Sequence, residues 1–274
     1  MVVQPVETFQ REYTIPAHLR HTADEPLSTK ASTRLRQMLA RPGIVVAPGV
    51  CDGISARCAL EAGFDCLYQS GAATTAAKLG MPDLAIATLP DFVQNAGMIT
   101  SLSYSTPLIA DADTGFGGPA MVARTVQMYD RAGVAGLHIE DQVQTKRCGH
   151  LLGKQVVSTE EFVTRIRAAV QARDAIPKAL APTPVLVNVI SGGLTPSFTT
   201  QEAEAMGAKI IIFSLVSAVA AVHAIREAMA LLKKTGTDHT SARGMDPRKF
   251  FEVVGLDEVI EVDRRAGGTA LSSI

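Results

Sequence analysis

The sequence predicts an α/β protein built on a parallel sheet that is covered by helices. From Gly43 onward, short β-branched runs alternate with amphipathic helical segments, and the expected strands are apolar along nearly their whole length. Such strands are typical of parallel sheets buried on both faces. The pattern fits either a β/α barrel or an open doubly wound sheet, and in both folds ligands bind at the carboxyl ends of the strands.

Six strands and several helix boundaries follow from the pattern. Residues 1–42 are polar with scattered proline and charge, so we expect an N-terminal arm with one helix at 32–40, followed by a single domain over 43–274. Capping-box spacing is found in two pairs, Thr88 with Asp91 and Ser158 with Glu161. Pro119 suits a first helical turn and Asp52 an N-cap, and two glycines suit helix ends, Gly133 and Gly207. The expected strands are 44–47, 64–68, 107–110, 134–139, 184–187 and 209–213.

The composition argues for a small-molecule ligand. The 274 residues carry a formal net charge of −1, which gives no broad basic field for nucleic acid or for an anionic membrane. No secretory signal and no membrane-spanning run are expected, and the four cysteines lack metal-type spacing. We therefore expect an intracellular protein, cytoplasmic in the first place, with mitochondria and peroxisomes left open.

Two charged clusters follow successive strands. Asp111 and Asp113 come directly after the apolar run 106–110, and Lys146-Arg-Cys-Gly-His150 follows Glu140. Asx-type turns would explain an isolated Asp-x-Asp, but Glu140 and Asp83 recur at neighbouring strand ends. Clustered carboxylates at the end of a buried strand favour a hard cation such as Mg²⁺, with Mn²⁺ as an alternative. The two clusters thus predict one site.

Cys148 is the cysteine with a predicted chemical role. It lies between Lys146 and His150, where basic neighbours should depress the thiol pKa and permit proton transfer near neutrality. An exposed loop cysteine is the alternative interpretation. The other three cysteines are expected to be packing residues, and His138 is expected to be a hydrogen-bonded core histidine. These three are Cys51, Cys58 and Cys66.

The motifs resemble those of the isocitrate lyase and phosphoenolpyruvate mutase superfamily. The pentapeptide Lys146 to His150 reads as the lyase signature, and the continuation 153–157 looks closest to the branch of 2,3-dimethylmalate lyase, petal death protein and oxaloacetate hydrolase, with 2-methylisocitrate lyase a near relative. The resemblance covers about 42–236. The other segments that follow the family's order are 68–72, 79–83, 111–117, 139–142 and Asn188.

The resemblance implies a (β/α)8 TIM barrel, usually a homotetramer of dimers that exchange a C-terminal helix. It implies a Mg²⁺-bound small carboxylic acid, with Asp111 on the metal and Asp83, Asp113 and Glu140 on its water ligands. Cys148 would be the acid-base thiol of a mobile loop. Catalytic candidates are Cys148, Lys146, His150 and Glu140; substrate-binding candidates are Tyr68, Ser70, Gly71, Ala72 and Asn188; metal-binding candidates are Asp111, Asp113 and Asp83.

The chain departs from the family in one interval. Between Arg173 and the strand expected at 184–187 the chain has only residues 174–183, whereas one β/α unit of a barrel takes about 30 residues. In relatives this interval carries a strand ending in an Ala-Arg-Thr-Asp type motif and a later strand ending in Glu. Downstream, Asn188-Val-Ile-Ser191 replaces Asn-x-Thr-Glu, and Phe213-Ser-Leu215 replaces Tyr-Pro-Leu. We therefore expect a barrel shortened by about two β/α units.

Three explanations of the shortening stay open. The chain is a natural variant with a different substrate, a catalytically impaired relative, or the product of an error in the gene model. The leading prediction is a Mg²⁺-dependent carbon-carbon lyase or hydrolase of a small 2-substituted malate, a methylisocitrate-like acid or oxaloacetate, working as a dimer or tetramer. The alternative is an impaired family member that acts as a binding or assembly partner. Phosphonate chemistry of the mutase type is disfavoured because the pentapeptide belongs to the lyases.

Overall fold

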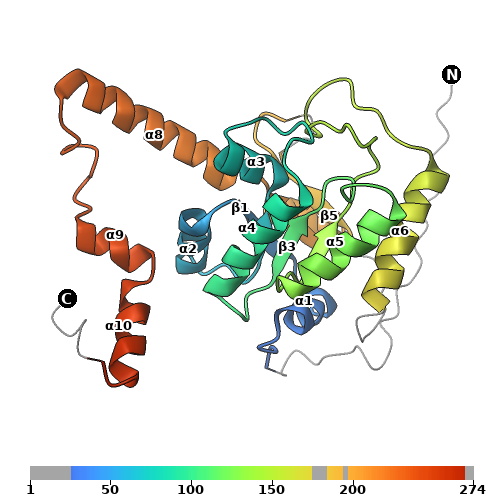
Figure 1. The fold of residues 1–274 in the computed structure, drawn as a ribbon, viewed down its shortest axis with the longest axis horizontal. Helices are drawn as coiled ribbons and strands as arrows, with labels where there is room; N and C mark the ends of the chain where they lie inside the picture. The colour runs from blue at the N-terminus through green and yellow to red at the C-terminus, as the bar shows by residue number, and fades with distance from the viewer. Residues whose placement is uncertain (1–25, 175–183, 194–196, 269–274) are drawn as a thin grey trace.

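The computed structural model describes residues 26–174, 184–193 and 197–268. Its helices and strands alternate around one sheet (Figure 1). The strands are β1 (Val45–Val50), β2 (Leu67–Gln69), β3 (Leu108–Asp111), β4 (Gly136–His138), β5 (Leu186–Asn188) and β6 (Ile210–Phe213). The helices are α1 (Ala31–Ala40), α2 (Gly53–Glu61), α3 (Gly71–Leu79), α4 (Leu89–Leu102), α5 (Pro119–Arg131), α6 (Thr159–Asp174), α7 (Thr200–Ala205), α8 (Val216–Thr235), α9 (Pro247–Val253) and α10 (Leu256–Arg265).

The sheet is a parallel barrel that stays open on one side. Its strand order is β4-β3-β2-β1-β6-β5, and every pairing between neighbours is parallel. Among the described residues, β4 and β5 are each paired along one edge only. This confirms the six predicted strands and the shortened TIM-type barrel. The interval 175–183, where the missing units were predicted, lies outside the described residues.

Alternation along the strands divides the core into an inner and an outer layer. Side chains of β1, β2, β3 and β6 that point inward form one cluster of Val45, Ala47, Cys66, Tyr68, Ile109, Ile210 and Ile212. The residues between them point outward, where Val50, Leu67, Leu108 and Ala110 pack on Phe92 and Ile99 of α4. Because successive strand residues alternate between faces, Asp111 continues the inward row begun by Ile109.

Helix α1 closes the lower end of the barrel. Leu35 is 5% exposed and belongs to the inner cluster, and Gly136 lies so near it that an added Cβ would be 3.1 Å from Leu35 Cδ2. Met38 and Leu39 of the same helix pack against this cluster as well. The boundary of the N-terminal arm at residue 42 stays a prediction, although the described part of the arm, α1, packs against the core. Residues 1–25 lie outside the described part of the chain.

The predicted helix boundaries agree with the hydrogen bonds. Thr88 N–H and hydroxyl donate to Asp91 Oδ2 at 2.9 and 2.7 Å, and Glu161 N–H donates to Ser158 Oγ at 3.2 Å. Asp52 accepts from Ser55 N–H at 2.8 Å at the start of α2, and α5 begins at Pro119. Gly133 and Gly207 have positive φ of 82° and 86°, which suits glycine after a helix.

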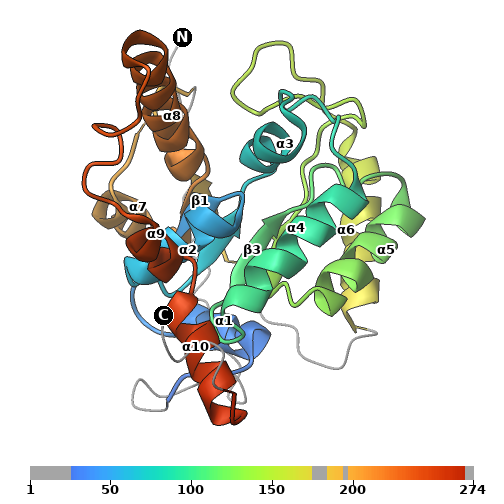
Figure 2. The same ribbon diagram turned by 60° about the vertical axis from the view of Figure 1, so that its left-hand side comes forward.

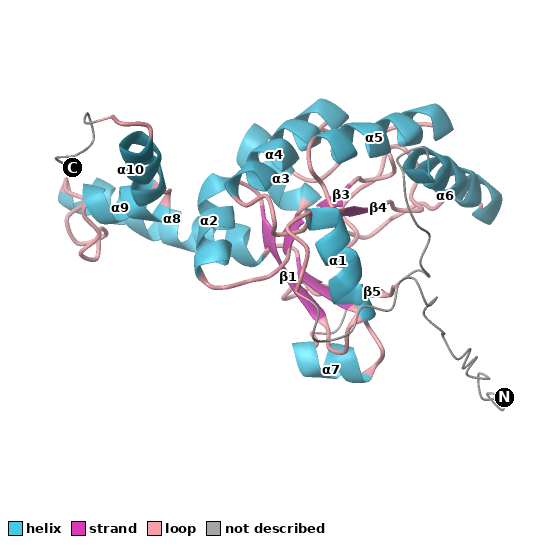
Figure 3. Ribbon diagram, turned by 90° about the horizontal axis from the view of Figure 1, so that it is seen from below, coloured by secondary structure: helices cyan, strands magenta, loops and turns pink. Residues whose placement is uncertain are grey.

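The C-terminal helices extend away from the barrel (Figures 1 and 3). Helix α8 carries no buried residue, and Ile225 and Met229 are 58% and 57% exposed. Arg57 on α2 forms an ion pair with both carboxylate oxygens of Glu258 on α10, at 2.8 and 2.7 Å. Figure 2 shows the ribbons of α8, α9 and α10 on the other side of the sheet from α5 and α6. Among the described residues, no helix is both long enough and apolar enough to cross a bilayer.

Gly49 marks the tightest strand contact. An added Cβ would lie 2.2 Å from the backbone oxygen of Ser214, so Gly49→Ala must push β1 away from the chain after β6. Overpacking of this kind costs about 1–3 kcal/mol or more, and we expect a melting temperature several degrees lower. The control is Gly97→Ala inside α4, where the added methyl makes ordinary contact at 3.9 Å with Ala132 Cβ and should be neutral or stabilising. Equal melting temperatures would contradict the close approach.

Candidate active site

The candidate site lies at the carboxyl ends of β2, β3 and β4, where inward-facing positions carry polar groups. Tyr68, Asp111 and His138 occupy neighbouring strands, and Asp111 is in register with His138. The Tyr68 hydroxyl lies 3.2 Å from Asp111 Oδ2 and 2.9 Å from His138 Nε2. The Tyr68 ring stacks on the imidazole with centroids 5.6 Å apart. The three side chains form one polar floor above the apolar barrel core.

Lys146 lies in the middle of the acidic residues. Its Nζ is 2.9 Å from Asp83 Oδ1, 2.7 Å from Asp113 Oδ1 and 3.8 Å from Glu140 Oε1. Its side chain is 1% exposed, so the ammonium depends on these carboxylates for the contacts that water would otherwise supply. The structure thereby brings the two predicted clusters together in one site.

The carboxylates differ in their electrostatics. Burial and the nearby Asp111 charge raise the pKa of Asp113 to about 7. Burial also raises the pKa of Asp111, but His138, Lys146 and the backbone amides of Asp113 and Gly71 bring it below the ordinary value. Burial raises the pKa of Glu140. Burial lowers the pKa of Lys146, but the surrounding acids outweigh it and raise the pKa overall.

These acids fit a hydrated Mg²⁺ ion better than a fully dehydrated one. No group of three or more described His, Cys, Asp or Glu side chains is placed to hold an ion directly. Asp113 Oδ1 is buried, lies 2.7 Å from Lys146 Nζ and has no further hydrogen-bond partner among the described residues. Mg²⁺ usually keeps several waters and binds through one or two carboxylates. The donor set therefore suits an ion held partly through water.

The loop that carries Cys148 is fastened to the acidic cluster. Cys148 N–H donates to Asp83 O at 2.9 Å, and Gln142 Nε2 donates to both Glu140 Oε2 at 2.7 Å and Arg147 O at 2.8 Å. At the far end of the loop, an added Cβ on Gly193 would be 2.2 Å from His150 Nδ1. The loop thus reaches from the β4 side of the barrel to the segment after β5.

The predicted activation of Cys148 is wrong for this conformation. Burial raises the pKa of its thiol, and the acids Asp83 and Glu140 add to that effect, while Lys146 only partly opposes it. Burial lowers the pKa of His150. Residues that are close in the sequence of a loop need not have side chains that are close in space. Here the side chain of Lys146 points into the acidic cluster.

The substrate-binding candidates already have internal partners. Ser70 caps α3, where its Oγ accepts from Ala73 N–H at 3.2 Å. Gly71 N–H donates to Asp111 Oδ2 at 3.1 Å, and an added Cβ there would lie 2.4 Å from the same oxygen. Ala72 is half-buried beside them. Asn188 ends β5 and accepts from Ser214 Oγ.

Sequence reasoning missed several groups at the site. His138 was expected in the core, but its side chain is 30% exposed and its Nε2 lies 3.9 Å from Asp111 Oδ1; counting the inward positions of β4 would have placed it there. Tyr129 donates to Asp111 O at 2.5 Å, and Gln142 links Glu140 to the loop. Among the expected packing cysteines, Cys51 and Cys66 are buried but Cys58 is exposed, so that prediction was wrong for Cys58.

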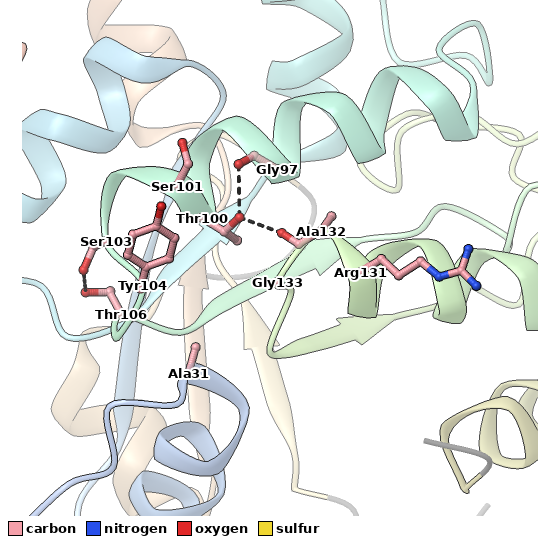
Figure 4. A pocket seen from close by; sticks show the side chains of 10 residues that line it. All are labelled: Ala31, Gly97, Thr100, Ser101, Ser103, Tyr104, Thr106, Arg131, Ala132 and Gly133. Carbon is pink, nitrogen blue, oxygen red and sulfur yellow. Dashed lines mark hydrogen bonds between the residues drawn. The ribbon is translucent and has the colours of Figure 1, made fainter. Parts of the chain in front are cut away.

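A separate pocket of about 220 Å³ lies at the opposite end of the strands. It is lined by the end of α4, the loop before β3 and the turn after α5. Figure 4 shows Thr100 bridging these segments, with its Oγ1 donating to Gly97 O at 3.1 Å and Ala132 O at 2.6 Å. Arg131 points away from the other lining side chains. This pocket is remote from the acidic cluster.

Fold and site together define a class of protein. A parallel β/α barrel with buried carboxylates and a loop thiol at the carboxyl ends of its strands is typical of an enzyme that acts on small ligands. Residues 35–180 match the family described as phosphoenolpyruvate phosphomutase. The chain belongs to the phosphoenolpyruvate mutase and isocitrate lyase superfamily, which confirms the resemblance carried by the motifs.

Individual relatives place the chain among the lyases of this superfamily. It is 32% identical to 2,3-dimethylmalate lyase of Eubacterium barkeri, over 85% of this chain and 96% of the relative. It is 32% identical to 2-methylisocitrate lyase of Bacillus subtilis, over 87% and 94%. A solved structure of oxaloacetate acetylhydrolase with the inhibitor 3,3-difluorooxalacetate is 43% identical, with a TM-score of 0.82 over 89% of this chain and 100% of that chain. The predicted enzyme class is thereby confirmed.

The raised pKa of Asp113 predicts a pH effect on stability. Its folded-state pKa of about 7 exceeds the ordinary 3.8. Between these two pH values the carboxyl is therefore protonated in the folded protein and ionised in the unfolded chain. This contribution is complete at low pH and is lost as the pH rises through about 7, by at most about 1.4 kcal/mol per pH unit.

Asp113→Asn should remove this pH dependence. In urea unfolding at pH 5.5 and 8.0, the wild-type protein should lose more stability over the interval than the variant. The control is Asp130→Asn at an exposed position of α5, which should follow the wild type. Parallel behaviour of wild type and Asp113→Asn would show that the carboxyl ionises normally.

Proposed function

We propose that the protein is a Mg²⁺-dependent enzyme, with Mn²⁺ as an alternative ion, that cleaves a carbon-carbon bond in a small dicarboxylic or tricarboxylic acid. The substrate classes are a 2-substituted malate, a methylisocitrate-like acid or oxaloacetate. The observation that carries the proposal is the grouping of Asp83, Asp111, Asp113 and Glu140 beneath the loop of Cys148. The relatives named above support the acid class.

The carboxylates would hold the ion and its waters. Asp111 would bind it directly, since its position is fixed by Gly71 N–H and Tyr68, while Asp83, Asp113 and Glu140 would bind its water ligands. When bound, the ion stabilises negative charge that develops on the substrate's enolate oxygen. Two further groups that could form hydrogen bonds with a substrate oxygen, the Tyr68 hydroxyl and His138 Nε2, lie next to the same position.

Proton transfer would be divided between two residues. Glu140, whose pKa burial raises, can accept the substrate's hydroxyl proton, because a general base works best with a pKa near the operating pH. Cys148 is half-buried with a raised pKa, so its thiol keeps a proton to donate to the substrate carbon. Lys146 and His150 would orient the loop. Ser70, Gly71, Ala72 and Asn188 would line the sites of the substrate carboxylates.

An impaired, non-catalytic relative is the second candidate. The segment 174–183 contains no arginine or glutamate, so the charged contacts that relatives place there are missing. Losing one charge-assisted contact costs about 1.5–3 kcal/mol. Such a protein would bind acids weakly and serve in assembly. We propose a dimer or tetramer in either case, because α8 presents an apolar stripe, and an intracellular place, because the described cysteines are free.

Thermal unfolding with Mg²⁺ and oxalate tests the proposed binding site without assuming a substrate. Binding at a hundred times the dissociation constant stabilises by about 2.7 kcal/mol, or roughly 5–10 °C for a chain of this size. We expect a shift that needs both components and that is lost in Asp111→Asn. Asp130→Asn is the matched control and should keep the shift. A wild-type protein that melts cooperatively without any shift would contradict the metal site.

Cys148→Ala tests the proposed chemistry. Turnover of 2,3-dimethylmalate, methylisocitrate and oxaloacetate should fall by at least about a hundredfold, the usual contribution of a general acid, while oxalate binding persists. Cys58→Ala removes an exposed thiol and should leave turnover unchanged. Unchanged turnover in Cys148→Ala would refute the role of the thiol. A wild-type protein that binds oxalate with Mg²⁺ but turns over none of these acids would favour the second candidate.

A further inference from the structure

Helix α6 buries an arginine on the face where apolar residues would be expected. The buried face consists of three positions, Arg165, Ala168 and Ala172, which are 4%, 9% and 6% exposed. Their spacing is that of the side of a helix that packs on a core. Arginine is almost never fully buried unless its charge is paired. The burial of Arg165 therefore indicates that its guanidinium has specific partners.

The guanidinium of Arg165 binds the segment that follows β4. Its Nη1 donates to Gln142 O at 2.8 Å and, more weakly, to Glu140 O at 3.5 Å. Its Nη2 donates to Glu161 Oε1 at 2.6 Å, one turn earlier on α6, and the Glu161 side chain is 56% exposed. The charge is thus paired toward the surface, while the other end of the guanidinium gives α6 a hold on the backbone at 140–142.

This hold lies at the open side of the barrel. On the β3 side, Glu140 N–H donates to Asp113 O at 2.7 Å. In the described part of the chain, no strand pairs with the other edge of β4. A backbone carbonyl that is shielded from water needs a donor, and here a helix side chain supplies it. Arg165 therefore fixes a segment that the sheet fixes from one side only.

The side chain of Gln142 extends this hold to the Glu140 carboxylate. Gln142 is 4% exposed, and its Nε2 donates to Glu140 Oε2 at 2.7 Å and to Arg147 O at 2.8 Å. Glu140 Oε1 lies 3.8 Å from Lys146 Nζ, which is beyond hydrogen-bond distance. With Oε2 engaged by the amide, Oε1 is the oxygen that faces the acidic cluster and is left for a ligand.

We propose that Arg165 is a positioning residue for the Glu140 carboxylate and that it acts through Gln142. The guanidinium fixes the backbone of Gln142, and the Gln142 amide keeps Glu140 Oε1 turned toward the acidic cluster. This role rests on the proposed function in that Glu140 accepts the substrate's proton. A displacement of about 1 Å at a reacting group can lower a rate by about a hundredfold, so an arginine that does not touch the substrate can set the rate.

Steady-state kinetics of the intact chain, with the acid that it turns over fastest, test this role. Arg165→Met removes the donors and keeps an apolar stem, so kcat should fall at least about tenfold while KM changes by less than about threefold, because Glu140 acts in the chemical step. Arg165→Lys keeps one donor group and should recover part of the loss. The matched control is Arg167→Met at an exposed position of the same helix, which should behave like the wild type.

A double-variant cycle tests the route through Gln142. Gln142→Met keeps the length of the side chain and removes its amide, so kcat should fall by a similar factor. Because both residues act on Glu140 in series, the double variant should be slower than the slower single variant by no more than about twofold. Fully additive losses would overturn this route. Rates are referred to folded protein below its melting transition, so a lower melting temperature with an unchanged kcat would overturn the positioning role.

Crystal structures of Arg165→Met and Arg167→Met provide a readout that does not depend on turnover. Glu140 Oε1 should be displaced in the first variant and keep its place in the second. An unmoved Glu140 carboxylate in Arg165→Met would overturn the positioning role even if kcat falls. A displaced carboxylate in that variant, together with a wild-type protein that turns over no acid, would refute the proposed function and support the role of Arg165.

Discussion

Negative charge gathered inside the upper end of the barrel is the constraint on which the rest of the site depends. Asp111 and Asp113 are 6% and 5% exposed, and carboxylates so placed need partners because water is largely excluded. The Tyr68 hydroxyl and Gly71 N–H donate hydrogen bonds to Asp111, and Lys146 forms ion pairs with Asp113 and Asp83. The Lys146 loop, the start of α3 and the ends of three strands are thus held together by the same charges.

The barrel supplies the apolar support for that charge. Inward-facing Ile109 and Ile212 lie below the polar layer, and Leu35 closes the floor. Outward-facing residues pack on α2, α4 and α7 in separate clusters. An apolar core beneath polar groups at the carboxyl ends of the strands is the general arrangement of barrel enzymes, and the pocket beside Thr100 lies at the opposite end of the strands.

The open side of the barrel changes the part of the site farthest from the acids. In the described part of the chain β4 and β5 do not pair with each other, and the loop with His150 reaches the backbone at Gly193. The loop thereby spans an interval that further β/α units fill in an eight-stranded barrel. Asn188, which ends β5 on the far side of the opening, accepts a hydrogen bond from Ser214 Oγ. Membership of the superfamily therefore constrains the class of reaction more firmly than it constrains the identity of the substrate.

The sequence by itself determined the parallel α/β class, six strands, most helix ends, the family and the acids of the site, because these follow from periodicity, capping residues and local motifs. It did not place α1 against the core, because Leu35, Met38 and Leu39, which pack there, form only one short i, i+3, i+4 pattern within a segment that is otherwise polar. It also misjudged His138 and Cys148. Their surroundings depend on strand register, which pairs His138 with Asp111, and on a loop whose lysine turns toward distant acids. Only the tertiary structure decides such contacts, because burial and charge from several elements act at one point.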